Sequence, residues 1–122
     1  MSANPPSSPT PAPRGGSTAS CEVRLVGRLG SRVDDRDLPS GDAVVTFTVI
    51  VDRARRARAA RPGPRVDAIP CQAFVAQVRR RVVDLEPGTW VEAEGTLRRR
   101  FWRSGAGLAS AMDVEVVRLR RA

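Results

Sequence analysis

Residues 43–51 of this 122-residue chain read AVVTFTVIV, the clearest β-strand pattern in the sequence. β-Branched residues dominate the stretch, and such side chains pack well on a pleated surface. Alternate residues of a strand point to opposite faces, so Val45, Phe47, Val49 and Val51 share one face. The pattern therefore predicts a strand with one face in the core.

The same alternation appears upstream of this strand. Val23 and Leu25 alternate with charged residues until Gly27 and Gly30 interrupt the run, as at a strand bend or bulge. Residues 34–42 then form a polar stretch that ends in turn-forming residues. We predict a first strand from Cys21 onward and a polar connection over residues 34–42.

Downstream, the patterns predict three more strands and one helix. The third strand is short and is broken or ends near Pro70. Residues 74–85 read FVAQVRRRVVDL, in which apolar side chains recur at helical spacing. The fourth strand has a bulge at Gly95, and an arginine-rich hairpin joins it to the fifth. The predicted bounds are residues 67–72 and 90–97 for the third and fourth strands, 98–107 for the hairpin and 108–119 for the last strand.

Five short strands with one helix between the third and the fourth are typical of an OB-fold barrel, an all-β architecture. A β-sandwich needs about seven strands, which the sequence does not offer. Residues 1–20 contain Pro, Ser, Thr, Ala and Gly with one charge, Arg14, and too little apolar surface to fold. We predict a disordered leader over residues 1–20 and an OB-fold domain over residues 21–122.

The composition argues against an enzyme. The chain has no His, which is the usual metal ligand and the commonest general base. No phosphate-binding loop or catalytic constellation is present, so we expect no catalytic residue and no cofactor. Asp34, Asp35 and Asp37 lack the spacing of a calcium loop, and a solvated loop is the expected alternative to a metal site.

Cysteine usage and hydropathy bear on the compartment. Cys21 and Cys71 form neither a metal-binding motif nor a disulfide framework, so we expect two reduced, packed thiols. A single disulfide between them stays open as an alternative. No apolar run approaches the roughly 20 residues of a membrane-spanning helix. These observations favour a cytoplasmic protein with no membrane contact.

The positive charge is concentrated in two places. The chain has 21 basic residues, all of them Arg, against 13 acidic ones, for a net charge of +8. We predict a mobile basic loop over residues 53–65, which contain no acid, and a basic hairpin around Phe101 and Trp102. Clustered cations repel one another unless a polyanion is near, so nucleic-acid contact is favoured over a merely solubilising loop. The loop holds Arg53, Arg55, Arg56, Arg58, Arg61 and Arg65, and the hairpin holds Arg98, Arg99, Arg100 and Arg103.

Three blocks of sequence resemble the bacterial single-stranded DNA-binding protein family. They are VRLVGRLG (residues 23–30), LPSGDAVVTFTV (38–49) and VEAEGTLR (91–98), in the family's order and spacing. The resemblance spans roughly residues 22–119. It implies an OB-fold that assembles as a homotetramer, binds single-stranded DNA with little sequence preference, and protects it in DNA replication, recombination and repair. The implied location is the cytoplasm, in association with the nucleoid.

The resemblance also implies four aromatic positions on which bases stack. Phe74 and Trp102 match two of them, while Arg55 and Ala68 stand at the other two. Phe74 could instead belong to the core, and for Trp90 a subunit contact or partly exposed packing is favoured over DNA contact. Arg79, Arg80 and Arg81 are interpreted as a solvated helix face. The predicted DNA-binding residues are Trp102, Phe74, Arg53, Arg55, Arg56, Arg58, Arg98, Arg100 and Arg103.

The end of the sequence, RLRRA, departs from the acidic tip through which members of this family recruit replication and repair enzymes. We therefore expect a short or specialised paralogue that does not dock protein partners through such a tip. A homotetramer is the favoured assembly, with a dimer as the alternative. The alternative function is a primosome-type OB-fold accessory module that acts mainly through protein partners.

Overall fold

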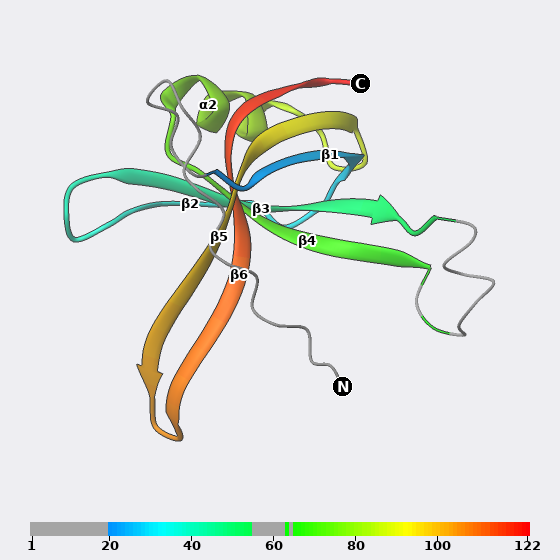
Figure 1. Ribbon diagram of the computed structural model, residues 1–122. Coiled ribbons are helices and arrows are strands. Elements are labelled where there is room, and N and C mark those ends of the chain that lie inside the picture. The colour runs from blue at the N-terminus through cyan, green and yellow to red at the C-terminus, as the bar shows by residue number, and fades with distance from the viewer. Residues whose placement is uncertain (1–19, 55–62, 64) are drawn as a thin grey trace, which may run out of the picture.

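The computed structural model describes residues 20–54, 63 and 65–122 (Figure 1). The predicted leader and most of the predicted basic loop lie outside these residues. The described part contains, in chain order, β1 (Glu22–Leu29), β2 (Asp34–Asp37), β3 (Ala43–Asp52), β4 (Val66–Ala73), α2 (Ala76–Asp84), β5 (Trp90–Ser104) and β6 (Gly107–Arg121).

Five of these strands close into a ring. β1 pairs with β5, β5 with β6, β6 with β4, β4 with β3, and β3 pairs back with β1. All of these pairings are antiparallel except that of β4 with β6. Helix α2 lies between the third and fourth strands of the ring in chain order. The predicted five-stranded OB-fold barrel with its single helix is therefore confirmed.

The short strand β2 corrects the prediction of an irregular connection over residues 34–42. β2 pairs antiparallel with the first half of β3, from Asp34 opposite Thr46 to Asp37 opposite Ala43. All four of its side chains are exposed, so backbone hydrogen bonds alone hold it in place. A strand that buries no side chain leaves no apolar alternation in the sequence, which is why the pattern missed it.

Strand β4 also differs from the prediction, because it continues through Pro70 to Ala73. Pro70 lies opposite Thr48, whose carbonyl accepts a hydrogen bond from Gly30 N–H (2.8 Å) and so faces away from β4. No donor is therefore required from Pro70 on that side. On its other side, β4 pairs with β6 only at Cys71 and Gln72.

The core fills the ring and is closed at one end by α2. The predicted inward residues of β3 contribute to it, and α2 adds two valines from its buried face. The buried cluster consists of Leu29, Val45, Phe47, Val49, Cys71, Ala73, Val78, Val82, Val91, Ala93, Val114, Val116 and Leu119.

Of the described helices, none has the length and hydropathy that crossing a membrane requires.

The long β5–β6 ladder changes phase at one bulge, as predicted. Its register shifts between Glu94 and Gly95, and Val117 has no partner opposite them. The buried positions of β6 change parity there, from Val114 and Val116 before the bulge to Leu119 after it. Beyond the barrel, the two strands continue as an arm that projects from the ring (Figure 1).

Gly95 allows the two backbones to approach at this bulge. A Cβ atom there would lie 2.0 Å from the carbonyl oxygen of Glu115. We expect Gly95→Ala to lower the free energy of unfolding by about 1–3 kcal/mol or more, because the strands must separate. Gly105→Ala is the matched control, since an added Cβ meets nothing within 4 Å there. Equal midpoints for the two variants in urea denaturation would contradict this account.

The outer face of β1, β5 and β6 carries a cluster of three charged side chains. Glu92 is buried there between Arg24 and Arg120. Arg24 Nε donates to one carboxylate oxygen, and Arg120 Nη2 and Nε donate to the other at 2.6 and 3.0 Å. The hydrogen bonds from Arg24, and then those from Arg120, hold the pKa of the Glu92 carboxyl below its ordinary value of 4.5.

This cluster predicts a pH-dependent contribution to stability. A folded-state pKa below the unfolded value means that the stabilisation is present above the unfolded value and is lost as the pH falls through the folded one. Glu92→Gln should therefore lower Tm at neutral pH, and its Tm should converge with that of the wild type in acid. Calorimetry with Glu86→Gln, an exposed glutamate without an ion pair to a described residue, provides the control. A wild-type advantage that persists undiminished in acid would rule this out.

Candidate nucleic-acid interface

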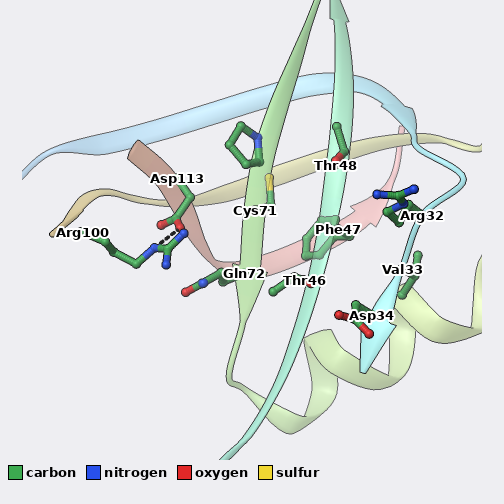
Figure 2. A pocket seen from close by; sticks show the side chains of 11 residues that line it. Arg32, Val33, Asp34, Thr46, Phe47, Thr48, Cys71, Gln72, Arg100 and Asp113 are labelled. Atoms are coloured by element: carbon green, nitrogen blue, oxygen red, sulfur yellow. Dashed lines mark hydrogen bonds and ion pairs between the residues drawn. The ribbon is translucent and has the colours of Figure 1, made fainter. Parts of the chain in front are cut away.

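A groove of about 530 Å³ runs over the outer face of β3 and β4. The outward residues of these strands form its floor, the segment between β1 and β2 forms one rim, and the base of the β5–β6 arm forms the other (Figure 2). The lining residues are Arg32, Val33, Asp34, Thr46, Phe47, Thr48, Pro70, Cys71, Gln72, Arg100 and Asp113.

The floor of the groove is polar without being charged. Because Phe47 and Val49 point into the core, the alternation of β3 turns Thr46 and Thr48 outward. Their hydroxyl groups and the amide of Gln72 can each donate and accept hydrogen bonds. Such a floor can contact phosphates, sugars or base edges without a charge of its own.

Arg100 and Asp113 form an ion pair at the rim of the groove. Asp113 is only 3% exposed although it lies on the outer side of β6, and its Oδ2 accepts a hydrogen bond from Arg100 Nε at 2.6 Å. The Arg100 side chain is itself half exposed. The carboxylate therefore fixes the guanidinium at Nε and leaves its terminal nitrogens available to an anion.

Trp102 lies on the same face of the arm as Arg100. The two are alternate residues of β5, and the Arg100 guanidinium carbon lies 5.8 Å from the centroid of a Trp102 ring. The indole is 45% exposed, so much of its surface is open. Arg98 precedes them on this face and lies 3.7 Å from a carboxylate oxygen of Glu115. The outer face of the arm thus presents Arg98, Arg100 and Trp102 in a row.

A sequence model described as the single-strand binding protein family matches residues 21–119. The chain belongs to this family. No curated protein sequence matches the chain. Among solved structures, the fold is similar to that of the Plasmodium falciparum SSB in its complex with ssDNA, with a TM-score of 0.72 and 18% sequence identity. That match covers 88% of this chain and 99% of the other.

The other residues predicted for this single-strand binding family member lie in different places. Arg53 is held at the end of β3 by an ion pair with Asp67, at 3.0 Å. Arg103 lies on the face of the arm opposite Trp102. Phe74 follows β4, is partly exposed, and belongs neither to the groove lining nor to the buried core. Arg55, Arg56 and Arg58 lie outside the described residues.

Two further positions help to define the surface. Ala68, at a position where the family resemblance implies an aromatic side chain, is exposed on the outer side of β4. Trp90 lies on β5, where the Arg28 guanidinium carbon is 5.8 Å from its ring centroid and Arg28 also pairs with Asp52 at 3.4 Å. Trp90 is therefore engaged on the barrel, away from the groove lining.

Sequence reasoning missed several groove residues. Arg32 lies on the rim beside Asp34, which was interpreted only as part of a solvated loop. Thr46 and Thr48 could have been found, because they are outward positions of a strand whose inward positions were predicted correctly. Gln72 could not, because no inward positions were predicted for its strand, which was expected to break or end near Pro70. Within the described ranges, no group of three or more His, Cys, Asp or Glu side chains is placed to hold a metal ion.

The two cysteines differ sharply in environment. Both are free thiols, and Cys71 is buried as predicted. The prediction that Cys21 is also packed is wrong, because Cys21 precedes β1 and is exposed. Burial is the main cause that raises the pKa of Cys71 to about 12. A buried thiol with so high a pKa holds almost no thiolate near neutral pH.

We expect an aromatic disulfide reagent such as DTNB to titrate one thiol in the native protein at pH 8 and two in denaturant. The native reaction should disappear in Cys21→Ser, since only the thiolate of an accessible cysteine reacts rapidly. Two equally fast thiols in the native protein would show that the Cys71 side of the groove opens.

Proposed function

We propose that this protein binds single-stranded DNA with little sequence preference and without catalysis. The observation that carries the proposal is the row of Arg98, Arg100 and Trp102 beside a polar groove on an OB-fold barrel. Family membership supports it, since single-strand binding is what the family is named for. The similar fold of the Plasmodium falciparum SSB, solved with ssDNA, also supports it.

The geometry suggests which residues contact the bases and which contact the phosphates of the DNA. Trp102 offers a π-face on which any base can stack, a contact worth about 1–3 kcal/mol per base. Arg100, fixed at Nε by Asp113, directs its terminal nitrogens to a phosphate. The hydroxyl and amide groups of the groove floor serve either sugars or bases. None of these contacts requires a particular base, which accounts for weak sequence preference.

The arm, more than the groove, provides the electrostatic attraction for DNA phosphates. Its lining contains two arginines, Arg32 and Arg100, and two aspartates, Asp34 and Asp113, so the lining itself is balanced. The arm adds Arg98, Arg99 and Arg103. Phosphate contacts therefore fall mainly along the arm and on the arginines after β3, and we infer strongly salt-dependent binding.

We further propose a homo-oligomer, with a tetramer favoured, that protects single-stranded DNA in replication, recombination or repair. Val26 and Trp90 are large exposed apolar residues on paired strands of the barrel, outside the groove, and offer a surface for subunit contact. Sedimentation equilibrium would test the assembly. A monomer at all concentrations would refute this part of the proposal.

The central test compares two tryptophans of nearly equal exposure. Trp102 is 45% exposed on the arm, and Trp90 is 48% exposed on the barrel. We expect Trp102→Ala to weaken binding of fluorescent oligo-dT by about 10–100-fold, the loss of one base stack. Trp90→Ala should have little effect on the affinity of a single barrel for short oligo-dT, because Trp90 lies outside the groove and the arm even if it contacts another subunit. Titration at several salt concentrations measures both the affinity and the number of phosphate contacts.

Duplex DNA of the same length is the second control. Preference for the single strand, sensitive to Trp102→Ala, supports the proposal. Equal affinity for single strand and duplex, unchanged in Trp102→Ala, would defeat the stacking mechanism. Weak DNA binding combined with tight binding to a replication protein would instead indicate an accessory module that acts through protein partners.

A further inference from the structure

We propose that the β5–β6 arm binds single-stranded DNA on both of its faces, and that Phe101 is a second base-stacking residue opposite Trp102. The inference rests on the proposed function and extends it. It assigns a role to the face of the arm that does not border the groove. That face, called the inner face of the arm below, consists of Arg99, Phe101, Arg103, Leu108, Ser110 and Met112.

The inner face exists because the β-strand alternation continues beyond the core. Leu97 and Val114 pair across the ladder and still pack in the barrel. Two residues closer to the tip of the arm on each strand, Arg99 and Met112 pair, and both are exposed. From there to the tip, side chains on the inner side of the ladder leave the core and become exposed.

Phe101 repeats on this face the arrangement of Trp102 on the other. It is 58% exposed, and the guanidinium carbon of Arg99 lies 5.0 Å from its ring centroid. On the outer face, Arg100 stands in the same relation to Trp102 at 5.8 Å. Each face of the arm therefore carries an arginine beside an open aromatic ring, two residues apart on β5.

Charge determines which occupant fits the inner face. None of its six residues is acidic, and neither Arg99 nor Arg103 forms an ion pair with any described residue. Besides its contact with the Phe101 ring, Arg99 donates one long hydrogen bond to a described residue, from Nη2 to Ser110 Oγ at 3.4 Å. An apolar protein surface would leave both cations unpaired. Single-stranded DNA supplies both kinds of partner: its phosphates can pair with Arg99 and Arg103, and its bases can stack on the Phe101 ring.

The tip of the arm leaves room for a DNA strand to pass from one face of the arm to the other. Residues 104–107 read SGAG, so no side chain there is larger than a hydroxymethyl group. A Cβ added at Gly105 or Gly107 would meet nothing within 4 Å. A single-stranded DNA whose bases stack on Trp102 can therefore continue around the narrow tip and reach Phe101 on the other face.

The test measures binding of oligo-dT of increasing length by wild type, Phe101→Leu, Trp102→Ala and Val83→Ala. Phe101→Leu keeps apolar bulk and removes the π-face, while Val83→Ala removes exposed apolar bulk from α2, outside the arm. We expect Trp102→Ala to weaken binding at every length. Phe101→Leu should weaken only the longer oligonucleotides, by about 5- to 100-fold, because short ones occupy the groove and the outer face alone. Val83→Ala should bind like wild type at every length, because Val83 belongs to neither face of the arm.

Two further measurements complete the test. Replacing Arg99 and Arg103 together by Ala should reduce the log–log salt slope for long oligonucleotides by about 1.4, or about 0.7 per phosphate contact. Sedimentation of Phe101→Ala without DNA should give the wild-type mass. A lower mass would identify the inner face as a contact between protein chains and overturn the inference.

The outcomes separate this inference from the proposed function. If wild type binds no single-stranded DNA at any length, both fail. If wild type binds and Trp102→Ala weakens it, but Phe101→Leu matches wild type at every length, only the second stacking site is refuted. A loss in Phe101→Leu limited to longer oligonucleotides, with an unchanged mass, establishes it.

Discussion

The structure depends on the closure of the five-stranded ring, and that closure is a contact between two backbones. β1, still paired with β5, also reaches β3 at Gly27, where a Cβ atom would lie 2.2 Å from the carbonyl oxygen of Ile50. The next residue, Arg28, pairs with Ile50 on one side and with Trp90 on the other. Only a glycine permits this approach. Closure also places β4 beside the base of the arm, through its pairing with β6 at Cys71 and Gln72, and so brings the floor and both rims of the groove together.

Once the ring is closed, the two-residue period of the strands assigns every side chain to the interior or to the surface. On β3 the interior set is apolar, and two of the outward residues, Thr46 and Thr48, are polar and become part of the floor of the groove. On β5 and β6 the same period continues past the end of the core. The outward set there carries Trp102 and the inward set carries Phe101, although nothing in the barrel remains for the latter to pack against. Both proposed DNA-contact faces of the arm therefore have the same origin: the alternation of side chains continues along β5 and β6 beyond the point where the core ends.

The sequence predicted the parts of this structure that bury apolar side chains. The alternation in β3, the helical spacing of Val78 and Val82, and the bulge at Gly95 all follow from what must face the core. The exposed strand β2 could not be predicted, because backbone bonding without side-chain burial leaves no mark on the sequence. The passage of β4 through Pro70 depends on which way Thr48 turns its carbonyl, a property of the folded ladder. For the candidate site, Trp102 and Arg100 could be chosen by composition, but the pairing of Arg100 with Asp113 and the separation of Arg103 from Trp102 required the register of β5 against β6.

The register also explains why net charge is a poor guide to where a polyanion binds on this chain. Many arginines of the barrel are already paired: Arg24 and Arg120 with Glu92, Arg118 with Glu94, and Arg53 with Asp67. Arginines paired in this way contribute little to affinity for an external anion, because each positive charge already has a negative neighbour. Towards the tip of the arm the carboxylates end, since β6 carries none before Asp113. Arg99 and Arg103 retain their full attraction for phosphate there, beside two open aromatic rings. The arginines of this chain thus fall into two groups. Those named on the barrel are paired with carboxylates of the fold, whereas Arg99 and Arg103, near the tip of the arm where the strands carry no carboxylate, are left to attract a DNA strand.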